Sequence, residues 1–277
     1  MRIARCSSEE RSFWAVVDPV RRVATPIKGS FASWAPEVTL SRSMEALELV
    51  GAEITLDKLR LLPPVEKTSK IEVVGANYAR HLAELGLEGS SQPVVFLKAH
   101  GALIGSYDPI RYPPKTKKLD YEVELVVVVG AAPLDHADPL SCVLGYTVGN
   151  DVSARDLQML GPRDISMDLF GAKSQDRTCG VGPWIVTADE FPAGQPKLKM
   201  ETRVNGEIRQ RGESGEMTWT VEELLRFSDE RSSLEPGDIL FTGTPQGVGH
   251  ASGRFLQRGD VVEAEIEGIG TLRNRVE

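Results

Sequence analysis

Short apolar runs of strand length, rather than long stretches of helical period, dominate the pattern of this chain. Such runs predict β-strands when glycine, proline, asparagine or aspartate bounds them. We expect strands at 70–75, 94–98, 122–129, 143–150, 184–186, 198–204, 207–211, 238–242 and 261–266, and helices at 78–87, 153–159 and 221–228. Asn205-Gly206 lies between two of these strands and is typical of a type I′ hairpin turn. The irregular order of the elements predicts an α+β, predominantly β fold rather than a doubly wound sheet.

The first 66 residues are expected to form a small N-terminal β-rich domain. Short strands are predicted at 13–17 and 22–24 around an Asp18-Pro19 turn, and a short amphipathic helix at 43–50. Pro63-Pro64 then interrupts the chain. We therefore predict two domains, at residues 1–66 and 67–277.

An acidic strand at 122–129 is the most informative element of the larger domain. Residues two apart in a strand point to the same face, so Glu122 and Glu124 lie side by side on the face of Val126 and Val128. Two adjacent buried carboxylates are costly unless a cation or protons neutralise them. A hard divalent cation with oxygen ligands is the expected partner. The alternative is an edge strand whose glutamates face water, which the run of four valines from Val126 disfavours.

A third carboxylate, Asp151, stands at the end of the next strong strand. Together with Glu122 and Glu124 it predicts a cradle of three carboxylates, completed by water and substrate. Such a cradle is typical of Mg²⁺, and Mn²⁺ or Ca²⁺ also accept oxygen-rich sites. The alternative for Asp151 is an ordinary helix cap, a role that Ser153 also fits.

Three further stretches carry candidate chemistry. His81 and Glu84 stand three apart, so on a helix they share a face, where a carboxylate orients an imidazole as a general base. Lys173 lies between glycine-containing turns, where a held lysine can stabilise an oxyanion. The glycine-rich turn 242–249 exposes N–H groups that can hold a carboxylate. The alternatives are a surface His–Glu pair, a solvated lysine and a tight strand connection.

Composition and charge narrow the class of protein. The 277 residues carry a net charge of −8 without a basic stripe, which makes nucleic acid an unexpected partner. Three cysteines without a CxxC motif fit a reducing cytoplasm. We find no run of about 18 apolar residues, so no membrane span is expected. The absence of a GxSxG motif disfavours a serine hydrolase.

Four motifs in order resemble the fumarylacetoacetate hydrolase family, and most closely its short acylpyruvase and oxaloacetate decarboxylase-type members. GxNYxxH corresponds to 75–81, YExEL to 121–125, NDVSARDLQ to 150–158 and TGTPxGVG to 242–249. The resemblance covers roughly residues 68–277. It implies a catalytic domain with a mixed sheet rolled into a partly open barrel, and a homodimer. The segments 96–100 and 160–170 depart from the family pattern and are expected to border the substrate tail.

The resemblance also implies roles for individual residues. Glu122, Glu124 and Asp151 correspond to the metal ligands, and His81, Glu84 and Lys173 to the catalytic residues. The corresponding substrate contacts are Tyr78, Arg155, Gln158 and the backbone of Thr244. The implied partner is a small anionic 2-oxo acid.

The implied function is metal-dependent hydrolysis of a C–C bond in acylpyruvate-type 2,4-dioxo acids through a metal-bound enolate. Decarboxylation of oxaloacetate and isomerisation of a dienoic 2-oxo acid need the same enolate and stay open. A different class of protein, a catalytically silent homodimer that binds a cation or 2-oxo acid, is disfavoured because a binding module needs no general base such as His81.

Overall fold

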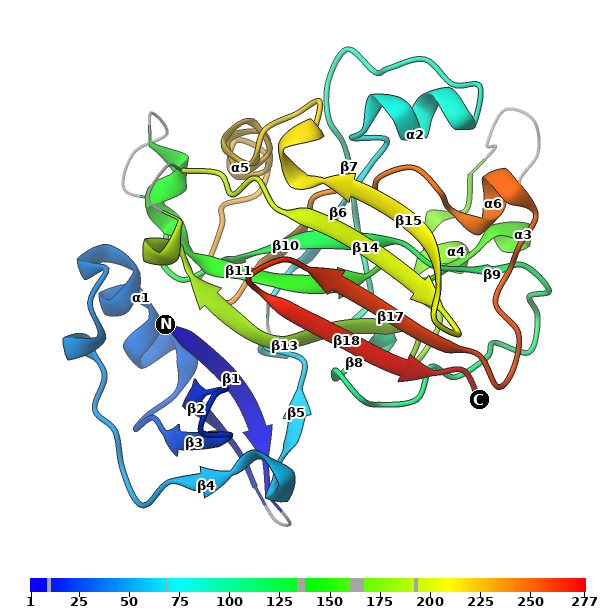
Figure 1. Cartoon of the computed structure of the whole chain (residues 1–277). Coiled ribbons are helices and arrows are strands. Elements are labelled where there is room, and N and C mark those ends of the chain that lie inside the picture. The colour runs from blue at the N-terminus through cyan, green and yellow to red at the C-terminus, as the bar shows by residue number, and fades with distance from the viewer. Residues whose placement is uncertain (9–10, 68, 134–137, 160–166, 192–193) are drawn as a thin grey trace.

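One large mixed sheet runs through the molecule and joins strands from both ends of the chain (Figure 1). The computed structural model describes residues 1–8, 11–67, 69–133, 138–159, 167–191 and 194–277. In order across the 12-stranded sheet lie β4, β3, β2, β1, β13, β11, β10, β16, β6 and β7, with β5 paired to β1 and β8 paired to β13. The order has two free ends, so the sheet is open rather than a closed barrel. The structure therefore confirms an α+β, predominantly β fold.

The strands of this sheet have the following bounds: β1 (Arg2–Ser7), β2 (Ser12–Asp18), β3 (Val23–Pro26), β4 (Ile54–Thr55), β5 (Arg60–Leu62), β6 (Ile71–Gly75), β7 (Val94–Leu97), β8 (Leu103–Ile104), β10 (Val123–Val129), β11 (Val143–Asn150), β13 (Cys179–Thr187) and β16 (Ile239–Phe241). Two pairs are parallel, β13 with β8 and β16 with β6. A separate short pair joins β9 (Leu119–Asp120) to β12 (Ser153–Ala154).

The acidic strand β10 occupies the middle of the sheet, between β11 and β16. Every residue of β10 is buried, as its continuous apolar run predicts. Glu122, just before the strand, is 4 % exposed, and Glu124 within it is 1 % exposed. The alternative of an edge strand with water-facing glutamates is therefore wrong.

A second sheet covers part of the first, with strands in the order β15 (Glu207–Glu213), β14 (Lys199–Val204), β17 (Val261–Ile266) and β18 (Gly270–Arg275) (Figure 1). The core between the sheets includes Val127, Tyr146 and Met200. Asn205 and Gly206 connect β14 to β15 and both have positive φ, 52° and 81°. These values are the ones that a type I′ turn requires, so the predicted hairpin is confirmed.

Short helices surround the end of the sheet where the candidate residues lie: α2 (Ala79–Glu84), α3 (Arg155–Gln158), α4 (Leu169–Lys173) and α6 (Gly249–Ser252). The longer α5 (Val221–Asp229) begins with a capping box between Thr220 and Glu223. The helix predicted at 153–159 begins only at Arg155, because residues 153 and 154 pair with β9. Neither Asp151 nor Ser153 caps it, so that alternative for Asp151 is wrong.

The N-terminal segment differs most from the predicted elements. An unpredicted helix, α1 (Phe31–Ser41), contains Pro36 and packs two aromatic rings, Phe31 and Trp34, around Trp14. The helix predicted at 43–50 is wrong, since only the single 3-10 turn Met44–Ala46 forms there. β1 pairs with β13, so the ladder continues into the rest of the chain. A separate domain at residues 1–66 stays a prediction.

None of the helices in the described ranges is long and apolar enough to cross a membrane.

Candidate metal centre and active site

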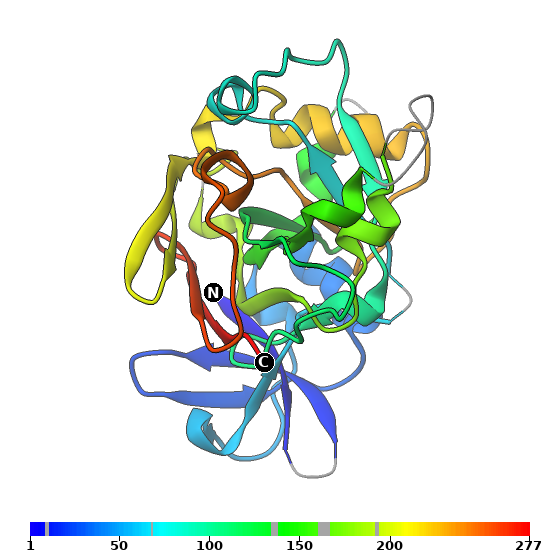
Figure 2. The same ribbon diagram turned by 90° about the vertical axis from the view of Figure 1, so that its right-hand side faces the viewer.

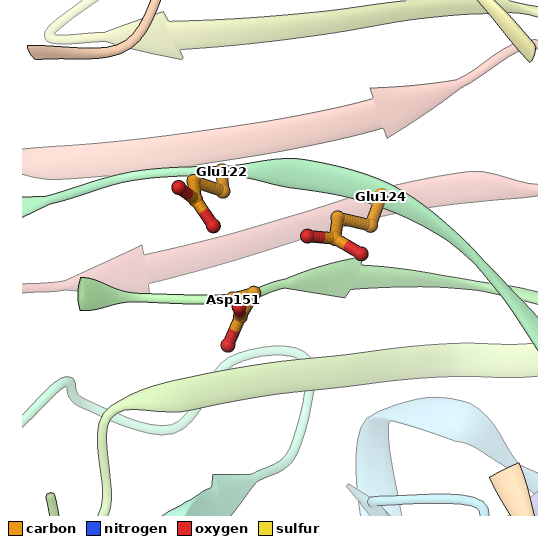
Figure 3. A group of neighbouring side chains, drawn as sticks. All are labelled: Glu122, Glu124 and Asp151. Atoms are coloured by element: carbon orange, nitrogen blue, oxygen red, sulfur yellow. The ribbon is translucent and has the colours of Figure 1, made fainter. Parts of the chain in front are cut away.

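Three carboxylates meet where β10 and β11 lie side by side (Figure 3). Glu122 directly precedes β10, Glu124 is its second residue, and Asp151 directly follows β11. One oxygen from each lies within 4.8 Å of the others, and all three residues are buried. We call this cluster the acidic site. The two-residue period of a strand and the antiparallel pairing of β10 with β11 place it there.

Glu122 is surrounded by cations. Its Oε1 accepts a hydrogen bond from Arg155 and its Oε2 accepts one from Lys173, while its backbone N–H donates to Asn150 Oδ1 at 3.0 Å. Burial by itself would raise the pKa of Glu122. The charges of Arg155 and Lys173 outweigh burial and hold the pKa of that carboxyl well below its usual range. Glu122 is thus held ionised.

Glu124 has the opposite environment although it lies only two residues away. Among the described residues, no ion pair involves it, and its Oε2 accepts a hydrogen bond from the N–H of Gly243 at 2.7 Å. Burial, then the charges of Asp151 and Glu122, raise the pKa of Glu124 well above its usual range. An additional cation beside Glu124 would favour the ionised carboxylate and lower its pKa.

Asp151 is fully buried and lies between two lysines. Its Oδ2 accepts a hydrogen bond from Lys173 Nζ at 2.6 Å. Lys98 Nζ lies 2.7 Å from its Oδ1, yet that oxygen accepts no well-directed hydrogen bond. Asp151 and Glu122 also raise the pKa of Lys173 above its usual range, against the opposing effect of burial. The alternative of a solvated lysine at 173 is therefore wrong.

These residues fit a divalent cation. They offer only oxygen ligands, they lie close enough to share one ion, and burial together with the charges of Asp151 and Glu122 raises the pKa of Glu124. Asp151 Oδ1 is in addition buried and accepts no well-directed hydrogen bond, although Lys98 Nζ lies 2.7 Å away. The acidic site can hold a divalent metal such as Mg²⁺ or Mn²⁺.

His81 and Glu84 make the contact that their spacing predicts. His81 Nδ1 donates to Glu84 Oε1 at 2.7 Å on one face of α2. The second carboxylate oxygen, Glu84 Oε2, accepts from the N–H of Gly247 at 2.8 Å. His81 is buried, so the alternative of an exposed surface pair is wrong. Because Glu84 holds Nδ1, the nitrogen left for proton transfer is Nε2.

The glycine-rich turn 242–249 holds carboxylates, but they belong to the protein itself. Gly243 binds Glu124 and Gly247 binds Glu84 through their N–H groups. Their φ values of 95° and 99° favour glycine. A Cβ at Gly247 would lie 2.2 Å from a backbone oxygen. The hydroxyl of Thr244 donates to the carbonyl of Val123, so the predicted role of Thr244 rests on its backbone.

Arg155 lies beside the acidic site, and its nitrogens already donate hydrogen bonds to other side chains of the protein. Its Nε donates to Asp120 Oδ2 at 2.9 Å, its second terminal nitrogen to Glu122, and its first makes a long contact of 3.4 Å with Gln158 Oε1. Asp120 in turn accepts from the N–H groups of Gly249 and His250. This geometry favours Arg155 as a residue that positions Glu122, more than as a direct substrate contact.

The predicted substrate contact at Tyr78 does not match its position. Tyr78 is 1 % exposed, and its hydroxyl points to Met200 Sδ at 3.5 Å. Its side chain is absent from the pocket lining given below. The residue starts α2 from a strand-like conformation, which turns its ring into the core between the sheets.

The acidic site opens into a pocket of about 260 Å³. One end is charged and one end is apolar. The charged end consists of His81, Glu122, Glu124, Asp151, Arg155 and Lys173, joined by Gln158 and Thr244. The apolar end, which we call the tail end, consists of Val73, Leu82, Leu85, Leu87, Val94, Phe96, Met167 and Leu169. Residues 160–166 of the segment expected to border the tail lie outside the described residues.

Sequence reasoning missed two charged residues of this centre, Lys98 and Asp120. Lys98 follows β7 and reaches Asp151 across 53 positions of sequence, and no local spacing signals that contact. Asp120 stands two positions before Glu122, so the alternation that identified the glutamates also placed it on their face. That signal was present for Asp120 and was not used.

An open mixed sheet with a buried acidic site at its centre, beside a His–Glu pair on α2, defines an α+β protein with a candidate divalent-metal site. The chain matches the model of the fumarylacetoacetate (FAA) hydrolase C-terminal domain over residues 70–277. It therefore belongs to the fumarylacetoacetate hydrolase family.

Proteins similar to this chain include a tautomerase, isomerases and a fumarylacetoacetate hydrolase. The chain is 39 % identical over 244 residues to oxaloacetate tautomerase Fahd2a, mitochondrial, from Rattus norvegicus, covering 87 % of this chain and 76 % of that protein. A solved 5-carboxymethyl-2-hydroxymuconate delta-isomerase from Mycobacterium smegmatis is 34 % identical, with a TM-score of 0.80 and coverage of 100 % and 99 %. A 2-hydroxyhepta-2,4-diene-1,7-dioate isomerase from Mycobacterium marinum is 32 % identical, with a TM-score of 0.79 and coverage of 100 % and 98 %.

Proposed function

We propose that this protein is a divalent-metal-dependent enzyme that forms the enolate of a 2-oxo acid and hydrolyses the C–C bond of acylpyruvate-type 2,4-dioxo acids. The observation that carries the proposal is the pair His81–Glu84 beside the acidic site. Glu84 fixes the imidazole through one oxygen and is itself fixed by Gly247 through the other. A base oriented in this way is suited to taking a proton from water or from a substrate carbon.

The acidic site would hold the metal through Glu122, Glu124 and Asp151. When bound, a divalent cation supplies Lewis-acid stabilisation of negative charge on substrate oxygens. The chain's own residues carry the proton transfers and orient the substrate. Arg155 and Lys173 keep Glu122 ionised and in place, and Gly243 does the same for one oxygen of Glu124.

Hydrolysis would begin with proton transfer from water to His81 Nε2. The water oxygen bonds to the distal carbonyl carbon, C4, and the resulting alkoxide is stabilised by Lys173, whose raised pKa keeps it protonated. The C3–C4 bond then breaks, and its electron pair stays on C3 as the enolate of pyruvate. The proton held by His81 passes to C3 and the alkoxide carbon becomes a carboxylic acid. The products are one carboxylic acid and pyruvate.

A second candidate is keto–enol tautomerisation of a 2-oxo acid, because a relative 39 % identical to this chain is named an oxaloacetate tautomerase. In that reaction His81 would take a proton from C3 and the enol would form by protonation of the C2 oxygen. No water attacks and no C–C bond breaks. The same base and the same acidic site serve both reactions. They diverge at the first step, in which His81 deprotonates either water or C3.

One experiment separates these reactions. Metal-loaded protein is mixed in D₂O with acetylpyruvate or oxaloacetate, and ¹H NMR follows the products. Hydrolysis yields acetate and pyruvate from acetylpyruvate. Tautomerisation accelerates keto–enol interconversion of oxaloacetate without cleavage, and decarboxylation yields pyruvate and CO₂ from oxaloacetate. Failure to convert either acid above the rate of a His81→Asn control would overturn the proposal and favour the silent binder. The implied homodimer stays a proposal that sedimentation tests.

A further inference from the structure

The tail end lines the same pocket as the acidic site and has a different chemistry. Leu82 and Leu85 come from α2 and its end, Leu87 from the loop that follows, and Val94 and Phe96 from β7. Figure 2 shows this loop passing from α2 over the top of the molecule and descending toward β7. Met167 and Leu169 complete the tail end.

Among the lining residues that the structure describes, the charged side chains belong to the other end of the pocket. Every Asp, Glu, Lys, Arg or His side chain in the described lining belongs to the acidic site or to its contacts. The two lining cations, Arg155 and Lys173, are already paired with carboxylates. Among the described lining residues, the tail end therefore offers no cation to a second substrate carboxylate.

We propose that the natural substrate carries an apolar tail on the carbonyl distal to its 2-oxo acid group, rather than a second carboxylate. This inference rests on the proposed function, since it assumes that the 2-oxo acid group binds at the acidic site. The tail then extends from the charged end toward Leu82, Val94 and Phe96. The substrate class is an acylpyruvate with an unbranched or lightly branched aliphatic acyl group.

Desolvation is the physical reason for this choice. Each tail methylene that leaves water for an apolar wall improves transition-state binding about three- to fourfold. A carboxylate moved to the same wall loses its hydration and gains no ion pair from the described lining residues. Two substrates of equal length, one ending in a methyl group and one in a carboxylate, should therefore differ by at least a hundredfold.

Cleavage of matched substrates measures this difference. We expect kcat/KM to rise about tenfold from acetylpyruvate to butanoylpyruvate, which has two more methylenes. Succinylpyruvate has a tail of the same length as butanoylpyruvate but ends in a carboxylate, and it should be at least a hundredfold poorer. Equal or better cleavage of succinylpyruvate would overturn the tail proposal and leave the proposed function intact.

Binding without cleavage tests the tail separately from the reaction. Calorimetry with metal-loaded protein compares 2-oxohexanoate with 2-oxoadipate, which differ at the tail terminus alone. We expect 2-oxohexanoate to bind at least thirtyfold tighter. If acylpyruvates are not cleaved and this preference holds, the hydrolase proposal fails and the tail proposal stands. If 2-oxoadipate binds as tightly or more tightly, the tail proposal fails whatever the reaction.

A variant that adds a positive charge tests whether Val94 contacts the substrate tail. Val94 is 43 % exposed, so Val94→Arg places a cation at the tail end without burying it fully. We expect the variant to lose at least tenfold on butanoylpyruvate and gain at least tenfold on succinylpyruvate. Leu97→Arg, on the same strand but outside the pocket lining, is the matched control and should keep the wild-type preference. An unchanged preference in Val94→Arg would contradict the assignment of this wall.

Discussion

The acidic site is built from central strands of the large sheet, whereas most of the tail end is built from α2, the loop after it, the edge strand β7 and the start of α4. Glu122, Glu124 and Asp151 are at most 4 % exposed, and backbone N–H groups or cations hold them. Leu87 and Val94 are 57 % and 43 % exposed, and β7 lies at one end of the sheet order. The two ends of one pocket thus differ in charge, and only the tail end includes side chains as exposed as Leu87 and Val94.

We expect the acidic site to determine the reaction and the tail end to determine which substrate is bound. A reaction that stabilises negative charge needs preorganised charged groups, and such groups require a rigid scaffold. Recognition of an aliphatic tail needs only apolar area, which a short helix and a loop can present. We therefore expect changes at the acidic site to alter catalysis and metal binding, and changes at the tail end to alter substrate preference.

The largest expected effect comes from the two glutamates of the acidic site. Glu122→Gln and Glu124→Gln should each lower kcat by at least 10³-fold, because each removes a charged metal ligand. Their effects on the metal-free protein should be opposite. Glu122→Gln removes one charged partner from Arg155 and one from Lys173, which keep Asp120 and Asp151 respectively, and should cost about 3 kcal/mol in the free energy of unfolding. Glu124→Gln removes like-charge repulsion and should leave stability equal or about 1 kcal/mol higher.

Urea unfolding in EDTA measures the stability of each variant, and turnover with added Mg²⁺ measures its activity. The two variants are matched controls for each other, since they make the same chemical change two residues apart. Equal destabilisation by both would contradict the difference in environment between Glu122 and Glu124.

The next largest effect is expected from loss of the general base, His81. His81→Asn should lower kcat by about 10²–10⁴-fold, the usual range for a general base. Metal affinity should change little, because His81 is not one of the three carboxylate ligands. Calorimetric titration of the variant with Mn²⁺ checks the affinity. A large loss of metal binding in His81→Asn would show that the imidazole belongs to the metal centre and would contradict its role as an independent base.

Much of the acidic site followed from the sequence, and little of its surroundings did. The period of a strand placed Glu122 and Glu124 on one face, and the end of the next strand supplied Asp151. Lys98 was missed because it reaches Asp151 from β7, and such contacts depend on which strands the fold brings together. The motif at Tyr78 says nothing about which way the ring turns as α2 begins, so its burial against Met200 could not be predicted, and its substrate role stays a prediction.

The N-terminal segment shows the same limit at the level of the fold. Helix α1 was missed because Pro36 stands within it, and proline is read as a helix breaker. The pairing of β1 with β13 joins residues more than 180 positions apart. Neither local propensity nor period carries information about such a pairing, since only burial in the completed sheet selects it. The tail end depends on long-range packing in the same way.

Metal binding should raise the free energy of unfolding by less than the Glu122→Gln change lowers it. This gain should depend on the acidic site and not on the tail end. At a Mg²⁺ concentration a hundredfold above Kd, the gain in unfolding free energy should be about 2.7 kcal/mol, seen as a higher Tm. Val94→Arg should keep this shift, whereas Glu124→Gln should lose most of it. Differential scanning fluorimetry with and without EDTA measures both. Loss of the shift in Val94→Arg would mean that the two ends are not independent.

The smallest expected effect comes from Asp108, a carboxylate outside the pocket that provides a baseline for the acid sensitivity of the fold. Asp108 accepts two hydrogen bonds from Arg60, both at 2.8 Å, and one from the N–H of Gly105. Burial by itself would raise the pKa of Asp108, but these donors outweigh burial and hold that pKa below its usual value. Because the folded pKa is lowered, the ionised form stabilises the fold above the ordinary pKa of about 3.9. That contribution is lost as pH falls through the lowered value.

Asp108→Asn should therefore cost about 1 kcal/mol at pH 7, a modest amount because Arg60 is 59 % exposed and water screens the pair. The difference between wild type and variant should stay constant down to about pH 4.5 and shrink below it. Urea unfolding at a series of pH values from 7 to 3 measures this difference. A difference that grows as pH falls would contradict the sign of the pKa shift. A constant difference would assign the effect to packing around Gly105, and acid loss of activity would then report on the acidic site without a contribution from this pair.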